Sequence, residues 1–123
     1  MQQRTLTITV DANARQALRA CAVAAFQADG YLGETLNFET PGAFFGRFTE
    51  RRWALVQTLM GAGELSLRET ARRLGRDITR VSEDVAVLVE LGLLERTAKG
   101  GVLCPFQDIE VHMRLQRQSR AAA

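Results

Sequence analysis

The sequence of 123 residues predicts an α+β fold, because segments with two different periodicities share one short chain. Three segments alternate apolar and polar residues with a period of two, as half-buried strands do: residues 4–10, 34–40 and 108–115. Two other segments, 66–74 and 77–91, repeat apolar residues at helical spacing behind residues that favour a helix N-cap. A glycine-rich turn at residues 98–101, between two short apolar runs, predicts a hairpin.

The N-terminal residues are expected to form a strand, a helix and a second strand. Asp11 follows the first strand and suits the N-cap of an alanine-rich helix over residues 12–28. In this helix Cys21 is expected to be a small buried thiol. Because short strands are not stable alone, we expect the three strands to pair with one another. The prediction is a small antiparallel sheet formed by the N- and C-terminal strands.

The residues after the second strand predict two helices. A short amphipathic helix follows residue 41 and contains three phenylalanines, which are expected to pack in the core rather than to stack on bases: Phe44, Phe45 and Phe48. Thr49 is the expected N-cap of a longer helix over residues 50–60, which carries its own apolar stripe. This helix ends at a pair of nearby glycines, Gly61 and Gly63.

The order of elements over residues 66–104 is that of a winged helix-turn-helix. Ser66 and Glu69 form a capping box at the start of a helix that ends before the turn residue Gly75. Asp77 caps a second helix, and its expected inward-facing residues are Ile78, Val81, Val85, Leu88 and Val89. The glycine-rich hairpin that follows is the wing. We therefore predict three parts: an N-terminal strand-helix-strand element (1–41), the winged helix (42–104), and a C-terminal strand with a frayed tail (105–123).

Positive charge is concentrated in one segment of a chain whose formal net charge is only +2. Residues 47–80 contain eight arginines against four acids, whereas the first 41 residues contain three arginines against four acids. An excess of this kind is expected where a protein contacts phosphates. Charge alone does not distinguish this interpretation from arginines that coat solvated helix faces.

A winged helix-turn-helix binds double-stranded DNA by placing the N-terminal turns of its second helix in the major groove. Arg80 is the strongest candidate for a guanine contact, because its guanidinium matches O6 and N7 of guanine. Glu83 can accept from cytosine N4, but an ion pair with Arg80 or Arg76 is the favoured interpretation. Because Arg72 and Arg73 are consecutive, one of them is expected to contact DNA. The full predicted set is Arg68, Arg72, Arg73, Arg76, Thr79, Arg80, Ser82, Glu83, Arg96 and Lys99.

Motifs along almost the whole chain match one group of regulators. They include the LTITV strand, the Phe38-Glu39-Thr40-Pro41 segment, the Glu90-Leu91-Gly92-Leu93-Leu94 junction (here with Val89 where the group has Leu), and the closing Ile109, Val111 and Leu115. The chain thereby resembles prokaryotic predicted transcriptional regulators of the MarR-like winged-helix type, in particular a small subfamily often encoded beside toxin genes. The resemblance implies a repressor that is the antitoxin of a toxin-antitoxin pair, with a cognate toxin as protein partner.

Several other classes of protein do not fit the sequence. With His112 as the single histidine and no Cys-x-x-Cys spacing, neither a metal site nor any other cofactor is expected. No nucleophile motif, phosphate-binding glycine loop or pair of catalytic carboxylates is found, so no enzyme is expected. No apolar run reaches the roughly 18 residues of a membrane span, and no signal peptide is recognised. A cytoplasmic protein without a membrane partner is therefore expected.

Two hypotheses for the main partner remain open. The first is a homodimer bound to paired DNA half-sites, with the helix over 12–28 and the terminal strands as the dimer surface. The alternative is a winged-helix protein-interaction module without specific DNA binding. Asp77, Glu83 and Asp84 favour that alternative, because they dilute the positive charge of the second helix. Binding through phosphates falls steeply with salt, which distinguishes the two.

Overall fold

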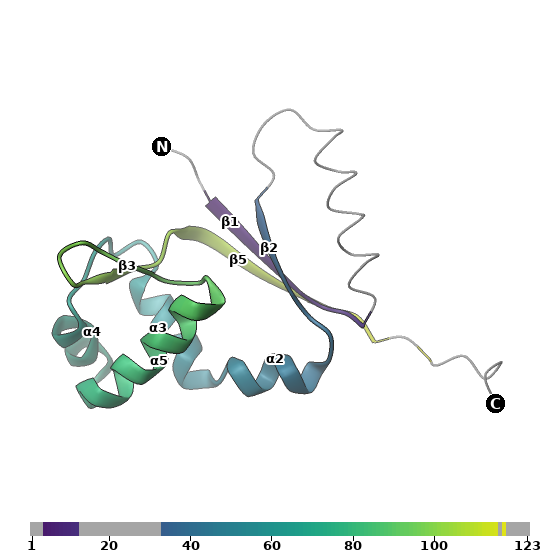
Figure 1. Ribbon diagram of the computed structural model, residues 1–123, viewed down its shortest axis with the longest axis horizontal. Helices are drawn as coiled ribbons and strands as arrows, with labels where there is room; N and C mark the ends of the chain where they lie inside the picture. The colour runs from purple at the N-terminus through teal and green to yellow at the C-terminus, as the bar shows by residue number, and fades with distance from the viewer. Residues whose placement is uncertain (1–3, 13–32, 116, 118–123) are drawn as a thin grey trace. The chain divides into compact units, whose positions relative to one another are not determined.

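The computed structural model describes residues 4–12, 33–115 and 117. The helix expected over residues 12–28, with Cys21 and the dimer surface assigned to it, lies outside the described residues except for residue 12. The described part is a mixed α+β structure, as predicted (Figure 1). Its elements are β1 (Arg4–Val10), β2 (Glu34–Phe38), α2 (Pro41–Arg47), α3 (Glu50–Leu59), α4 (Leu67–Leu74), α5 (Ile78–Leu91), β3 (Glu95–Arg96), β4 (Val102–Leu103) and β5 (Phe106–Met113).

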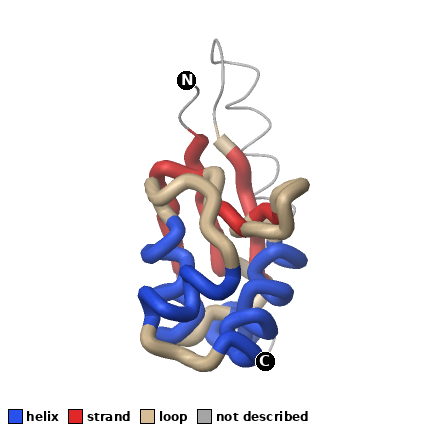
Figure 2. Tube along the Cα trace, turned by 90° about the vertical axis from the view of Figure 1, so that its left-hand side faces the viewer, coloured by secondary structure: helices blue, strands red, loops and turns tan. Residues whose placement is uncertain are grey.

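The described residues divide into two compact units. Residues 4 and 45–108 form what we call the helical unit, which contains α3, α4, α5, β3 and β4. The described residues of 5–44 and 109–117 form the sheet unit, which contains β2 and most of β1 and β5. Figure 2 distinguishes the helices from the strands in both units by colour.

The sheet unit holds a three-stranded parallel sheet in the order β2-β1-β5, so the prediction of an antiparallel sheet is wrong. The strands do pair with one another as expected: Val10 lies opposite Phe38 on β2, and its carbonyl accepts from the backbone N–H of Arg114 at 3.2 Å. Alternation of apolar residues does not determine strand direction. Parallel neighbours need a connection of roughly a dozen residues or more, and residues 11–33 between β1 and β2 are long enough for one.

The strands of this sheet differ in burial. β1 lies between the other two, and its alternating Leu6, Ile8 and Val10 are all buried, as predicted. β5 lies at the edge, and of its predicted apolar face Ile109 is half-buried but Val111 and Met113 are exposed, so that face is formed only in part. The predicted bounds of β1 are confirmed, whereas β2 is two residues shorter at its C-terminal end and β5 is shifted by two residues toward the N-terminus.

In the helical unit, α3, α4 and α5 pack against one another around an apolar core. Its fully buried side chains include Leu55, Leu59, Val81, Val85, Leu88, Leu93, Leu94 and Val102. Near the start of the unit, Phe48 is buried and stacks on Trp53 with 4.7 Å between ring centroids. Of the other two phenylalanines of the cluster, Phe44 is buried as predicted but Phe45 is exposed.

The hairpin of β3 and β4 is antiparallel, with Glu95 opposite Leu103. A third short segment joins it, because Leu65 and Val102 exchange two backbone hydrogen bonds of 2.9 and 2.8 Å. Gly101 allows this close approach: a Cβ at that position would lie 2.9 Å from the carbonyl oxygen of Leu65. The hairpin is thus tied to the residues just before α4.

Candidate nucleic-acid interface

Local hydrogen bonds fix where α4 begins and ends. The Ser66 hydroxyl accepts from the backbone N–H of Glu69 at 3.0 Å, which confirms Ser66 as the predicted N-cap. Buried Thr70 adds a second bond, donating from its hydroxyl to the carbonyl of Ser66 at 2.8 Å. At the other end Gly75 adopts a φ of 64°, a left-handed conformation that favours glycine. This turn leads directly to α5.

The first turn of α5 is ordered by its own cap. The Asp77 carboxylate accepts from the backbone N–H groups of Thr79, at 3.1 Å, and Arg80, at 3.4 Å. These are two of the donors that have no partner within the helix, so Asp77 satisfies them. The cap therefore fixes the backbone that carries the side chains predicted to contact DNA.

The buried side of α5 is the predicted one, with one exception. Val81, Val85 and Leu88 are fully buried, and Val89 is half-buried. Ile78 was predicted to face the core, but 43% of its surface is exposed. The helical spacing predicted the buried face correctly, but Ile78 is the first residue of α5, one turn before the first fully buried side chain, and is covered only in part.

Arg80 remains the strongest candidate for a base contact. Its side chain is exposed, and no salt bridge or side-chain hydrogen bond engages it in the part of the chain that the structure describes. Thr79 and Glu83 are exposed on the same N-terminal half of α5, whereas Ser82 is half-buried. Among the salt bridges of the described residues Glu83 takes part in none, so its expected pairing with Arg80 or Arg76 is not formed.

Arg76 is not available for DNA in the way the sequence suggested. Its guanidinium donates to the Asp84 carboxylate at 2.7 Å, and Arg52 of α3 donates to the other Asp84 oxygen at 3.0 Å. Arg52 also donates to the carbonyl of Arg47 at 2.8 Å. We call Arg52, Asp84 and Arg76 the Asp84 cluster. It ties α3 and the turn before α5 to α5 itself.

The Asp84 cluster is largely withdrawn from water. The side chains of Arg52, Arg76 and Asp84 are 20%, 17% and 15% exposed. Burial raises the pKa of Asp84, but the hydrogen bonds from Arg76 and Arg52 outweigh burial and hold this pKa below its ordinary value. Asp84 is thus ionised at neutral pH and forms ion pairs with both arginines. No local pattern in the sequence indicated that Arg52 would pair with Asp84.

A second cluster lies on the surface of α4. Both oxygens of Glu69 accept from Arg72, one of them from Nε at 2.9 Å, and Arg73 donates to the same carboxylate at 3.1 Å. These hydrogen bonds, with that from Arg72 the strongest, lower the pKa of Glu69 to about 2. We call these three residues the Glu69 cluster. The capping role expected for the Glu69 side chain is replaced by these ion pairs.

The remaining predicted contacts lie on α4 and the hairpin. Arg68 is exposed on the first turn of α4. Arg96 and Lys99 are exposed on and beside the hairpin. The turn between β3 and β4 is held by Thr97, whose hydroxyl accepts from the backbone N–H of Gly101 at 2.9 Å. Eight of the ten predicted residues are therefore exposed, and Arg76 and Ser82 are not.

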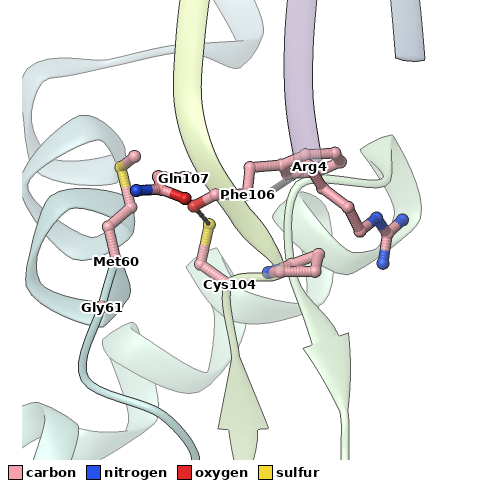
Figure 3. A pocket seen from close by; sticks show the side chains of 7 residues that line it. Arg4, Met60, Gly61, Cys104, Phe106 and Gln107 are labelled. Carbon is pink, nitrogen blue, oxygen red and sulfur yellow. Dashed lines mark hydrogen bonds between the residues drawn. The ribbon is translucent and has the colours of Figure 1, made fainter. Parts of the chain in front are cut away.

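The helical unit also contains a cavity of about 370 Å³, seen in Figure 3. Its lining is Arg4, Met60, Gly61, Cys104, Pro105, Phe106 and Gln107. Arg4 lies 5.1 Å from the centroid of the Phe106 ring and pairs with Glu95 at 3.4 Å. Burial raises the pKa of the Cys104 thiol, which donates weakly to the carbonyl of Phe106 at 3.9 Å. Cys104 is thus a protonated, structural thiol at neutral pH.

Metal binding and membrane crossing were both considered for the described residues. Within residues 4–12, 33–115 and 117, no three histidine, cysteine or acidic side chains gather closely enough to hold a metal ion. Among the helices of the same residues, none combines the length and the apolar character needed to cross a membrane.

Comparison with known proteins gives one match. The model of the HVO_A0114 family matches residues 47–111, which is more than half of the chain and includes all ten predicted DNA-binding residues. No curated protein and no solved structure matches the chain. The family's name states no activity, so the function has to be argued from the geometry of the helical unit.

Proposed function

We propose that this chain, which belongs to the HVO_A0114 family, is a sequence-specific regulator that binds double-stranded DNA through a winged helix-turn-helix in its helical unit. In this proposal α4 and α5 are the two helices of the motif, α5 enters the major groove, and the β3–β4 hairpin is the wing. The order of these elements and the turn at Gly75 support the assignment. The bridge between Leu65 and Val102 supports it further, because it holds the hairpin beside the start of α4.

The contacts made by the acidic side chains at and near the start of α5 favour DNA binding. Asp84 is neutralised by two arginines from outside the helix, and Asp77 is engaged with backbone N–H groups at the cap. Asp77 and Glu83 are both exposed and take part in no salt bridge among the described residues, and of the two Asp77 is engaged at the cap. The exposed N-terminal turns of α5 therefore present Thr79 and an unpaired Arg80, which suits a groove lined with acceptors.

In the proposed complex, phosphate contacts come from the flanking elements. The residues are Arg68, Arg72 and Arg73 on α4, and Arg96 and Lys99 on the hairpin. Arg76 holds Asp84 and is assigned no contact with DNA. The proposal includes no enzymatic activity and no cofactor.

Regulation as a repressor, action as a homodimer and pairing with a toxin belong to the same proposal. The resemblance of the sequence to the toxin-linked MarR-like regulators suggests the role as a repressor and the pairing with a toxin. Exposed Val111 and Met113 on the edge strand β5 suggest a protein contact by the sheet unit. The same exposed residues favour the second candidate function, a protein-interaction module without specific DNA binding.

The decisive experiment measures DNA affinity as a function of salt. A preferred site is first selected from a pool of random duplexes, and binding of the full chain is then followed by fluorescence anisotropy between about 50 and 200 mM salt. Contacts with several phosphates predict a steep linear fall of log K with log salt. If no duplex is enriched and the chain does not bind at low salt, the DNA-binding proposal is wrong and the interaction module is favoured.

Substitution of Arg80 tests the assigned role of α5 within the same assay. Arg80→Ala should weaken the selected site by about 5- to 150-fold, equivalent to roughly 1–3 kcal/mol, and reduce the preference for it over random DNA. Arg114→Ala is the matched control, because it removes an exposed arginine of the sheet unit. Equal losses in the two variants would contradict the recognition role of Arg80.

A further inference from the structure

Ile78 is an exposed large apolar side chain at the position that the proposed function places closest to DNA. Five large apolar side chains are exposed in the part of the chain that is described: Phe45, Ile78, Val111, Met113 and Leu115. Ile78 is the one among them that belongs to α4 or α5. Burial of an isoleucine side chain stabilises a fold, and with 43% of its surface exposed Ile78 supplies only part of that stabilisation.

The local structure gives this side chain a defined position. Asp77 caps the helix immediately before Ile78. Its carboxylate accepts from the backbone N–H groups of the two residues that follow Ile78. The backbone at the first turn of α5 is therefore fixed by two hydrogen bonds. A β-branched side chain in a helix strongly prefers one χ1 rotamer. Ile78 thus presents a pre-organised apolar surface, which loses little conformational entropy when it is covered.

Helix geometry explains why this surface lies at the margin of the core. Ile78 lies in line with Val81 and Val85, both fully buried, but about one turn nearer the end of the helix. A helix that enters the major groove by its N-terminal turns presents its first residues to the base edges. In that orientation Ile78 and Thr79 are the foremost residues of the helix.

We infer that Ile78 is a specificity-determining residue that contacts the C5-methyl group of a thymine in the DNA site. Thymine is the one base that offers a methyl group in the major groove, and apolar side chains read it by contact. The inference rests on the proposed function and extends it, because it names a base that the site must contain. It also assigns apolar readout to α5 beside the polar readout by Arg80.

Deoxyuridine substitution tests the contact without altering any hydrogen-bonding group. Each thymine of the selected site is replaced in turn by deoxyuridine, and affinities are measured for the wild-type chain and for Ile78→Ala. For wild type, one thymine per half-site should show a loss of about fourfold, the value expected for one buried methyl group. Ile78→Ala should bind the unmodified site more weakly and show no further loss at that thymine.

Two more variants keep the test independent of folding. Ile78→Val retains a β-branched apolar side chain and should keep part of the sensitivity to deoxyuridine. Phe45→Ala shortens an exposed apolar side chain of α2, which has no assigned contact with DNA, and should keep all of it. Circular dichroism on each variant verifies that the helices are retained.

The outcomes separate the inference from the proposed function. If wild type binds the selected site but no thymine position is sensitive, or if the sensitive position stays sensitive in Ile78→Ala, the inference is overturned and DNA binding stands. If Ile78→Ala dissociates a dimer in sedimentation while its sensitivity is unchanged, Ile78 belongs to a contact between two copies of the chain. Failure of wild type to bind any duplex overturns the proposed function, and the inference falls with it.

Discussion

The Asp84 cluster and the Glu69 cluster each join one carboxylate to two guanidinium groups, and each carries a net charge of +1. They differ in exposure. No side chain of the Asp84 cluster is more than 20% exposed, whereas Arg72 and Arg73 of the Glu69 cluster are 71% and 44% exposed. They also differ in how far apart their residues lie in the sequence: Arg52 is 32 residues from Asp84, but Arg72 and Arg73 lie one helical turn from Glu69.

This comparison shows that exposure, rather than composition, decides what an arginine can do. Water screens an ion pair on the surface of α4, so the pair adds little to stability and its arginines can exchange the carboxylate for a phosphate. Ions withdrawn from water interact more strongly and depend on their partners. Arg76 depends on its ion pair with Asp84 in this way, because its Nη1 atom is buried without a hydrogen-bond partner. In the proposed complex the Asp84 cluster therefore holds the interface together, and the Glu69 cluster belongs to that interface.

The largest effect is expected when the centre of the Asp84 cluster is removed. Asp84→Ala leaves two half-buried guanidinium groups without their shared carboxylate, and should lower the free energy of unfolding by about 2–3 kcal/mol. Urea denaturation at neutral pH measures this loss. The pKa of Asp84 is lowered by folding, so its contribution is present above the ordinary aspartate pKa and is lost as the pH falls below it.

The control for Asp84→Ala is its neighbour in sequence. Glu83 is exposed and takes part in none of the salt bridges of the described residues, so Glu83→Ala should change stability by less than about 0.5 kcal/mol. If the two variants have equal stability, the Asp84 cluster is not a structural tie and the contrast between the clusters disappears.

One arginine from each cluster gives the next comparison. Arg76→Ala should lower the free energy of unfolding by about 1–2 kcal/mol, because it removes a hydrogen bond to a partly buried carboxylate. Arg73→Ala should leave the urea midpoint unchanged and weaken binding to every duplex alike. Both variants are measured by urea denaturation and by anisotropy on random DNA. Equal losses of stability, or a larger loss of DNA affinity in Arg76→Ala, would contradict the assignment.

Local features of the helical unit could be predicted from the sequence because their causes are local. Ser66, Thr49 and Asp77 are N-caps in the structure, since each side chain bonds a backbone N–H two or three residues later. Gly75 and Gly92 end α4 and α5 in the left-handed conformation. Such signals need no knowledge of the tertiary structure. The predicted pairing of the terminal strands was also confirmed.

The errors concern properties that depend on distant parts of the chain. Strand direction depends on how the connection returns, which alternation in the strands does not encode. The exposure of Ile78 depends on where the core ends, whereas helical spacing predicts only which face of the helix is buried. The partner of Arg76 could not be found from sequence, because Asp84 has several arginines within reach and the choice requires α3 to be in place. The ion pairs of Glu69, at spacings of three and four, follow from the helix alone.

The smallest effect is expected when the acid of the Glu69 cluster is removed. Glu69→Gln frees Arg72 and Arg73 from their shared carboxylate while keeping a side chain of the same size. Affinity for random duplexes should rise a few-fold, and the slope of log K against log salt should steepen by about one. Anisotropy titrations of wild type and Glu69→Gln at several salt concentrations measure both quantities.

The pKa of Glu69 sharpens this last test. Because that pKa is lowered to about 2, the carboxylate of the free protein is ionised throughout the range from about pH 5.5 to 7.5. The difference in salt slope between wild type and Glu69→Gln should therefore be the same at both ends of this range. Glu64→Gln is the matched control, since it removes an exposed acid outside the cluster. If Glu64→Gln raises affinity as much as Glu69→Gln does, general charge rather than release of the α4 arginines governs binding.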